Sequence, residues 1–513
     1  MGMYITRRSA MGLLAGAIPA ARRAAAQATG LEIQKGPFVG TRESLKAYRV
    51  PEWFRDAKFG IWAHWGPQSA PEQGDWYARR MYIQGDRTYN WHREHFGHPS
   101  KVGFKDVIPT FKGEKFDPEH LMDLYQKAGA KYFFSMGVHH DNFDLWNSKH
   151  TRWNAVNMGP KKDIVGLFRQ AALKRGMKFG VSEHLWISWK WFGVSHDSDK
   201  TGPYAGVPYD GNDPQNFDLY HDLPRDYPAE VPWNDDGIPD SWKRHWFDRI
   251  KDLVDNYQPD ILYTDGPLPF EEYGLSLVAH LYNDSARRHG GKVEAVYNSK
   301  LKEDCAEGTC VLDFERGLAD AIAPNAWQTD TCVGDWHYRR DINYKSPKTV
   351  IDMLVDIVSR NGNLLLNFPL PGSGALDDKE LAILAEITKW MAVNSEGIYA
   401  TRPWKIFGEG PGSKVKGTGR FNENGRKALT AEDVRFTTKG KTLYAFLMGR
   451  PEKQAVVASL ATKGKLEAGK IHNVELLGYK GKLKWTQDEA GLKVELPGEK
   501  PSDHAVTLKV ALG

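Results

Sequence analysis

The sequence predicts a parallel (β/α)8-like barrel followed by a C-terminal antiparallel β-sandwich. Two observations predict this order. Up to about residue 398, short apolar, β-rich runs alternate with segments of helical periodicity. Beyond that point, helical periodicity stops and short alternating runs are separated by Gly, Lys and Asn. We therefore expect a barrel over residues 31–398 and a sandwich over residues 399–513.

The expected barrel strands are continuous apolar runs, as is typical of parallel strands that are covered on both faces. The count approaches eight, which favours a closed barrel. An open, doubly wound sheet is the alternative, but no Gly-rich dinucleotide fingerprint follows any strand. The predicted strands cover residues 59–63, 132–138, 178–184, 261–265, 293–297, 310–314 and 363–368.

Helices are expected between these strands. Pro118 stands at the first position of one helix, Asp163 begins a second, and Asp240 is the expected N-cap of a third. A long insertion rich in Trp, Tyr, Pro and Gly covers residues 186–239. Loops of this length in a compact domain are usually functional, so we expect this one on the catalytic face of the barrel.

The first 28 residues are predicted to be an export signal. Arg7 and Arg8 precede a short apolar run over residues 12–18, and Ala26-Gln27-Ala28 matches a cleavage site. The paired arginines indicate the Tat route, with a Sec signal or a mitochondrial presequence as alternatives. No later segment reaches the roughly 20 apolar residues of a membrane span. We expect a periplasmic or secreted protein.

The charge balance changes once this leader is removed. The whole chain has 69 Lys and Arg, 65 Asp and Glu, and a formal net charge of +4. The leader contains four arginines and no Lys, Asp or Glu, so its removal leaves 65 basic residues against 65 acidic ones. A neutral chain gives no indication of nucleic acid or an anionic surface as a partner.

Polar residues follow three of the predicted strands. Asp265 ends the run at 261–265 and precedes a glycine, His64 follows the first strand, and His139 and His140 follow the second. A (β/α)8 barrel assembles its active site from the C-terminal ends of its strands. These side chains are therefore the candidate catalytic and binding residues.

Four motifs in order give the chain a family resemblance. They are residues 58–67 (KFGIWAHWGP), Asp75-Trp76-Tyr77, residues 129–132 (GAKY) with 139–143 (HHDNF), and residues 359–367 (SRNGNLLLN). With these motifs the chain resembles glycoside hydrolase family 29, the α-L-fucosidases. The resemblance covers most of the chain after the leader.

The resemblance implies a retaining exo-glycosidase that acts on a fucosylated oligosaccharide or glycoconjugate. It implies that Asp265 is the nucleophile. A retaining enzyme needs a second carboxyl group nearby as acid/base. Glu315 is our candidate because it ends a predicted strand after Asp265. Glu307, in the neighbouring loop, and Glu183, at the end of the third strand, are the alternatives.

The remaining candidates would bind the sugar. His64, His139 and His140 would bond its hydroxyl groups, and Trp76 would contact the fucose methyl. Tyr263 lies two residues before Asp265 and should share its face. Because adjacent strand residues point to opposite faces, His139 and His140 form a poor chelating pair unless the strand has ended. We therefore expect no metal and no cofactor. The full set of predicted binding residues is His64, Asp75, Trp76, His139, His140 and Tyr263.

The chain departs from the family pattern at three places. Val138 and Asn142 replace the usual Lys and Gly, Asp75 stands where Glu is usual, and residues 182–184 read Ser-Glu-His. A related sugar such as galactose is thus an alternative substrate, and a non-catalytic carbohydrate-binding protein is an alternative function. We expect the C-terminal sandwich to brace the barrel, with glycan binding as its alternative role.

Overall fold

The computed structural model describes residues 30–513 except 226, 415–420, 424–427, 464–465 and 467–468. The predicted export signal at residues 1–28 lies outside the described residues. Within the described part of the chain, no helix is both long and apolar enough to cross a membrane.

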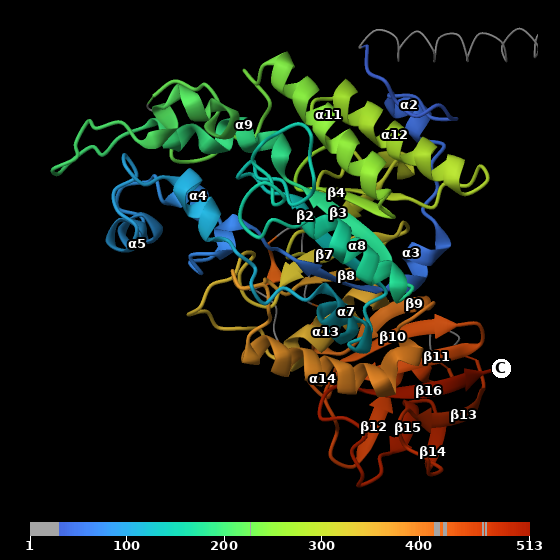
Figure 1. The fold of residues 1–513 in the computed structure, drawn as a ribbon. Coiled ribbons are helices and arrows are strands. Elements are labelled where there is room, and N and C mark those ends of the chain that lie inside the picture. Colours follow the sequence, from blue (N-terminus) through green and yellow to red (C-terminus); the bar gives the residue numbers. More distant parts are fainter. Residues whose placement is uncertain (1–29, 226, 415–420, 424–427, 464–465, 467–468) are drawn as a thin grey trace, which may run out of the picture.

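Eight parallel strands form a closed barrel in which β1 pairs with both β2 and β8 (Figure 1). Closure joins the first and last strands, with Phe59 opposite Leu364. The predicted barrel is thus confirmed, and the doubly wound alternative is wrong. The strands are β1 (Phe59–Ala63), β2 (Tyr132–Val138), β3 (Lys178–Glu183), β4 (Ile261–Thr264), β5 (Val296–Ser299), β6 (Val311–Asp313), β7 (Trp327–Cys332) and β8 (Gly362–Asn367).

Strand β7 was not predicted from the sequence, because its centre is polar. All of its residues are nevertheless buried. Inside the barrel these polar groups find partners: Gln328 accepts a hydrogen bond from the Tyr132 hydroxyl (3.0 Å), and Asp330 accepts one from the Tyr263 hydroxyl (2.9 Å). Buried polar groups that are hydrogen-bonded are tolerated, so this strand needs no apolar pattern.

Helices cover the outside of the barrel. Pro118 begins its helix as predicted, and Asp163 is the N-cap one residue before its helix begins; the side chains of Asp117 and Asp163 accept hydrogen bonds from the amides of His120 and Gly166. The prediction for Asp240 is off by one residue, because Pro239 is the N-cap and Asp240 begins the helix. The helices that follow strands are α7 (Pro118–Lys127), α8 (Ile164–Lys174), α11 (Asp240–Tyr257), α12 (Glu272–Arg288), α13 (Pro347–Ser359) and α14 (Asp378–Asn394).

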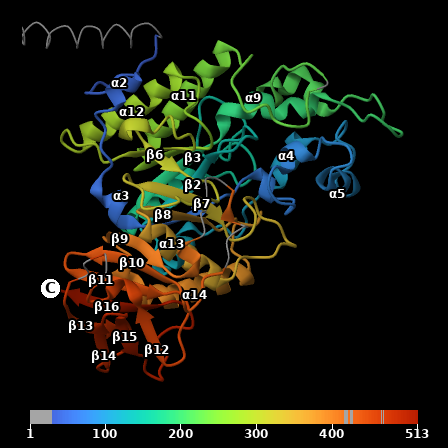
Figure 2. The ribbon, with the colours of Figure 1, turned by 180° about the vertical axis from the view of Figure 1, so that it is seen from behind.

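Short helices fill the long connections after β1 and β3. Figures 1 and 2 both show α4, α5 and α9 side by side at one end of the barrel, away from the C-terminal sheets. The insertion at 186–239 is therefore on the same side as the segment after β1. The short helices are α2 (Arg42–Leu45) and α3 (Glu52–Ala57) before β1, α4 (Tyr77–Arg80), α5 (Arg87–His95) and α6 (Phe104–Val107) after it, and α9 (Ser188–Trp191) and α10 (Phe217–Tyr220) in the insertion.

The C-terminal part forms two antiparallel sheets around a separate apolar core, as predicted. It is joined to the barrel through Asp356 of α13, which pairs with both Arg360 and Arg435. The Arg360 guanidinium also lies 3.7 Å from the centre of the Phe407 ring. One sheet contains β9 (Arg402–Glu409), β10 (Val434–Lys439), β11 (Thr442–Leu447), β13 (Ile471–Leu476) and β16 (Val506–Leu512), and the other contains β12 (Gln454–Val457), β14 (Trp485–Asp488) and β15 (Gly491–Glu495).

Candidate active site

Three carboxylates meet one buried ammonium group at the C-terminal end of the barrel. The Nζ of Lys300 lies 3.1 Å from Asp265 Oδ1, 2.7 Å from Glu315 Oε2 and 3.1 Å from Asp330 Oδ2. The Asp265 and Glu315 oxygens are thus at most 5.8 Å apart (3.1 Å plus 2.7 Å). The predicted nucleophile and acid/base therefore belong to one cluster.

Strand ends position Asp265, Lys300 and Glu315, whereas Asp330 lies within β7. Asp265 follows β4, and its amide donates to the Glu183 carbonyl (3.0 Å). Lys300 follows β5 directly, and Glu315 comes two residues after β6. Lys300 was missed because the fifth strand was predicted to end at residue 297. With the true end at 299, the strand-end rule that selected Asp265 also selects Lys300.

The two catalytic candidates have opposite pKa shifts. Burial alone would raise the pKa of Asp265, but Lys300 and His184 outweigh it and hold this pKa well below its ordinary value. Burial raises the pKa of Glu315 to about 7, and the charges of Asp330 and Asp265 add to the effect while Lys300 opposes it. Neutral pH therefore leaves Asp265 ionised and Glu315 about half protonated, which is the division of roles expected for a nucleophile and an acid.

Histidines surround the other oxygen of Asp265. His184 Nδ1 lies 3.0 Å and His140 Nε2 lies 3.5 Å from Asp265 Oδ2. Strand β2 ends at Val138, so His139 and His140 both lie beyond the strand, and their ring centres are 4.5 Å apart. His184 was not among the predicted site residues, although residues 182–184 stood out as a departure from the family pattern.

Two of the remaining histidines, His64 and His139, offer uncharged hydrogen-bonding groups. Burial holds the pKa of His64 and of His139 well below its ordinary value, so both rings are neutral at pH 7. His337 Nδ1 donates to Asp75 (2.6 Å). Among the described residues, His64 Nδ1 and His337 Nε2 have no hydrogen-bond partner. A neutral imidazole donates through one nitrogen and accepts through the other, as sugar hydroxyls require.

Aromatic rings flank the histidines and carboxylates of the site. The half-buried Trp76 ring is in edge contact with His140 and Trp191, at centroid distances of 6.0 Å in each case. Trp233, which is exposed, lies 5.8 Å from Trp76. Trp191 and Trp233 come from the 186–239 insertion, so this insertion contributes to the site as well as lying on its side of the barrel.

Three other candidates have different positions. Tyr263 is fully buried, packs on Trp62 and donates to Asp330 of the Lys300 cluster. Glu183 is fully buried, and its carboxylate accepts hydrogen bonds from the Thr264 hydroxyl and the Trp246 ring nitrogen. The carboxylate of Glu307 is 59% exposed and pairs with Lys46. Neither alternative acid/base contacts Lys300 in any ion pair that the structure shows.

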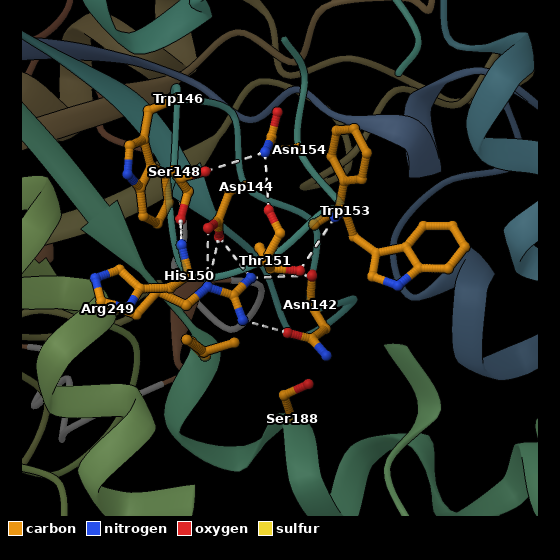
Figure 3. A network of polar contacts seen from close by, with 12 residues as sticks. Asn142, Asp144, Trp146, Ser148, His150, Thr151, Trp153, Asn154, Ser188 and Arg249 are labelled. Carbon is orange, nitrogen blue, oxygen red and sulfur yellow. Dashed lines mark hydrogen bonds and ion pairs between the residues drawn. The ribbon is translucent and has the colours of Figure 1, made fainter. Parts of the chain in front are cut away.

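A buried network supports the turn after His139 and His140 (Figure 3). Asn142 has a φ of 59°, a conformation that glycine and asparagine adopt most easily. This explains why asparagine can stand where the family pattern has glycine. Arg249 of α11 donates to Asn142 Oδ1 (2.6 Å) and pairs with Asp144 (2.6 Å). The Asn142 amide group also donates to the Leu219 carbonyl (2.9 Å), which ties the turn to the insertion.

We expect Arg249→Ala to destabilise the protein strongly. Arg249 and Asp144 are 1% and 0% exposed, and removing the arginine leaves a buried carboxylate without its counter-ion. The expected cost is about 3–5 kcal/mol. Urea unfolding at pH 7 measures it. Arg244→Ala on the same helix is the matched control: its pair with Asp248 is exposed, and its loss should cost less than about 1 kcal/mol.

Three groups of side chains in the described part of the chain could hold a metal ion, since their candidate ligand atoms lie within 4.8 Å of one another. His139 belongs to two of these groups, and His184 belongs to two. Nitrogen and carboxylate ligands of this kind suit zinc. The same atoms also suit sugar hydroxyls, and Asp265 already has Lys300 as a counter-ion. That the site works without a metal stays a prediction. The groups are His64–His139–His184, Asp75–His139–His337 and His140–His184–Asp265.

Comparison with known proteins identifies the family. Residues 25–396 match the model of the Alpha-L-fucosidase family, and residues 427–511 match that of the Alpha-L-fucosidase C-terminal domain. The chain belongs to the α-L-fucosidase family. It is therefore a member of a family of glycoside hydrolases, as the sequence motifs predicted.

Relatives within the α-L-fucosidase family cover nearly the whole chain. The mouse tissue alpha-L-fucosidase is 29% identical over 493 residues, which are 92% of this chain and 94% of the mouse protein. The human tissue alpha-L-fucosidase is 28% identical over 478 residues, 90% of this chain and 88% of the human protein.

Solved structures of α-L-fucosidases share the fold. The Thermotoga maritima alpha-fucosidase in complex with fucose has a TM-score of 0.71 and 24% identity, covering 92% of this chain and all of that one. The alpha-L-fucosidase isoenzyme 1 from Paenibacillus thiaminolyticus has a TM-score of 0.64 and 21% identity, with 92% and 99% covered. The barrel and C-terminal sheets are therefore those of known α-L-fucosidases.

Proposed function

We propose that this protein is an exported α-L-fucosidase that releases terminal fucose from glycans with retention of configuration. The observation that carries the mechanism is the separation of at most 5.8 Å between the Asp265 and Glu315 oxygens (3.1 Å plus 2.7 Å through Lys300). Retaining glycosidases place their carboxyl groups about 5–5.5 Å apart, whereas inverting enzymes leave about 6.5–9.5 Å for a water molecule.

The reaction follows from the two pKa shifts. Ionised Asp265 attacks the anomeric carbon while protonated Glu315 gives its proton to the leaving oxygen. A covalent glycosyl-enzyme forms on Asp265. Glu315, now ionised, then takes a proton from a water molecule that attacks the same carbon and releases fucose. Lys300 lies between the two groups, where it stabilises whichever carboxylate is charged.

We propose an α-L-fucoside as the substrate because of the family and because the site combines polar and apolar groups. Neutral histidines provide groups for hydroxyls, and Trp76 provides an apolar face for the methyl group of a deoxy sugar. Hydrolysis of an aryl α-L-fucoside beside an aryl α-galactoside tests this part. Turnover of the fucoside alone supports it. Turnover of the galactoside alone would replace the substrate, and turnover of neither by folded protein would favour the non-catalytic alternative.

Export is the remaining part of the proposal. It is supported by the paired Arg7 and Arg8 and by the Cys305–Cys310 disulfide, since disulfides persist in oxidising compartments. Cys332 is free and buried. Replacing both arginines with lysine should keep the protein inside a bacterial host that has the Tat route. Unchanged export would contradict a Tat signal.

We expect Lys300→Met to shift the whole pH profile of kcat/KM to higher pH. The Lys300 charge lowers the pKa of both Asp265 and Glu315, so its loss raises both. At pH 6 the rate should also fall on the order of 10²-fold, because a buried charge that stabilises the reacting groups is lost. Lys302→Met is the matched control, since Lys302 is exposed and should leave the profile unchanged. A profile that keeps its position in Lys300→Met would contradict this role.

A further inference from the structure

A short segment of the C-terminal part lies against the backbone that carries Glu315. The amide of Phe421 donates to the Glu315 carbonyl (2.9 Å), and the amide of Glu423 donates to the Arg316 carbonyl (3.1 Å). Phe421 and Glu423 thus bond to two successive residues, Glu315 and Arg316, which we call the catalytic segment. The C-terminal part therefore contacts the segment of the barrel that carries Glu315.

The Glu423 side chain anchors this segment. Its carboxylate is 4% exposed and accepts from the Thr331 hydroxyl (2.6 Å), and it lies 3.1 Å from Lys345 Nζ and 3.6 Å from Arg316 Nε. A buried carboxylate is stable only when it is paired in this way. The partners come from β7, from the chain before α13 and from the catalytic segment itself. Residues 421–423 are therefore tied to three parts of the barrel.

Phe421 has an unusual position for an aromatic residue. Among the described residues it has the most exposed large apolar side chain, at 62%. Its φ of 58° is also uncommon for a bulky residue. Exposure of a large ring to water gives no gain in folding, whereas an aromatic surface beside a binding site contributes to binding. The hydrogen bond from its amide to the Glu315 carbonyl places the backbone of Phe421 beside that of the proposed acid.

We propose that Phe421 forms part of the leaving-group subsite and contacts the sugar to which fucose is attached. The proposal rests on the function proposed above, because an acid at Glu315 must protonate the leaving oxygen. The leaving group therefore passes beside Glu315 and so beside Phe421. The apolar C–H face of a pyranose matches an exposed aromatic ring. Glu423 holds the segment in place, and the leaving group is a saccharide with such a face.

The test compares two substrates of the full-length enzyme. One is a fucosylated disaccharide, and the other is α-L-fucosyl fluoride, whose leaving group has no surface to contact a ring. In Phe421→Ala the ratio of kcat/KM for the disaccharide to kcat/KM for the fluoride should fall about three- to tenfold, the size of one aromatic contact. Phe421→Trp should restore the ratio. Val456→Ala, which also truncates an exposed side chain, should leave it unchanged.

An unchanged ratio in Phe421→Ala would overturn the proposal. This includes an equal loss on both substrates, which would show that Phe421 only supports the fold near Glu315. Failure of the wild-type enzyme on both substrates is distinguishable, because it overturns the proposed function and this subsite with it.

Discussion

Asp265→Gly should abolish hydrolysis of α-L-fucosides, with a loss on the order of 10⁴-fold or more. The carboxylate is the proposed nucleophile, and no other described carboxylate contacts Lys300, His140 and His184 together. Its removal leaves space at the anomeric carbon. Added azide should therefore restore turnover and give β-L-fucosyl azide, because azide attacks from the face that Asp265 occupied. Steady-state kinetics and NMR of the azide product measure both effects.

Asp248→Gly provides the control for this variant. Asp248 lies on α11 with a partly exposed side chain that pairs with Arg244, outside the site. This variant should keep nearly full activity and show no response to azide. Activity of Asp265→Gly within about tenfold of the wild-type value would contradict the nucleophile assignment. An azide product of α configuration would contradict it as well.

Glu315→Ala should lower kcat/KM about 10²- to 10⁴-fold on substrates whose leaving group needs a proton. Aryl fucosides with acidic phenols should lose less. The wild-type rate should be steady at mildly acidic pH and fall as pH rises through about 7, because the acid is active only when protonated and its pKa is raised to about 7. In Glu315→Ala this fall should disappear. These effects are measured by pH profiles of kcat/KM for two substrates. One has a leaving group that needs a proton, and the other is an aryl fucoside with an acidic phenol.

Glu307→Ala is the matched control, since Glu307 was the rival acid/base in sequence terms and is 59% exposed beside Lys46. It should leave the pH profile unchanged. If Glu307→Ala lost the fall above pH 7 while Glu315→Ala kept it, the two assignments would have to be exchanged.

The fold and the place of Asp265 at a strand end could be predicted because their signals are local. A buried parallel strand is a short apolar run, and the residue that ends it points to the active site. Asp265, His64, His139 and His140 all follow such runs. The motifs around them added the family, and the structure confirms the barrel that both signals implied.

The unpredicted part depends on contacts between distant segments. Strand β7 is polar because its side chains bond across the barrel interior, so no apolar pattern reveals it. Lys300 was missed because the predicted end of β5, at residue 297, was two residues too early. Tyr263 shares the strand that leads to Asp265, but its full burial and the bond from its hydroxyl to Asp330 depend on a distant strand. The approach of Phe421 to Glu315 joins residues 106 positions apart (421 minus 315), and no spacing in the sequence indicates it.

We propose that Asp265 and Glu315 together hydrolyse an α-L-fucoside with retention of configuration. The most direct test is to follow hydrolysis of an aryl α-L-fucoside by NMR and to identify the anomer of fucose that forms first, before mutarotation. The short distance between the two carboxyl groups predicts α-L-fucose. Initial release of β-L-fucose would show inversion, and would contradict both the covalent intermediate on Asp265 and the roles assigned to the Lys300 cluster.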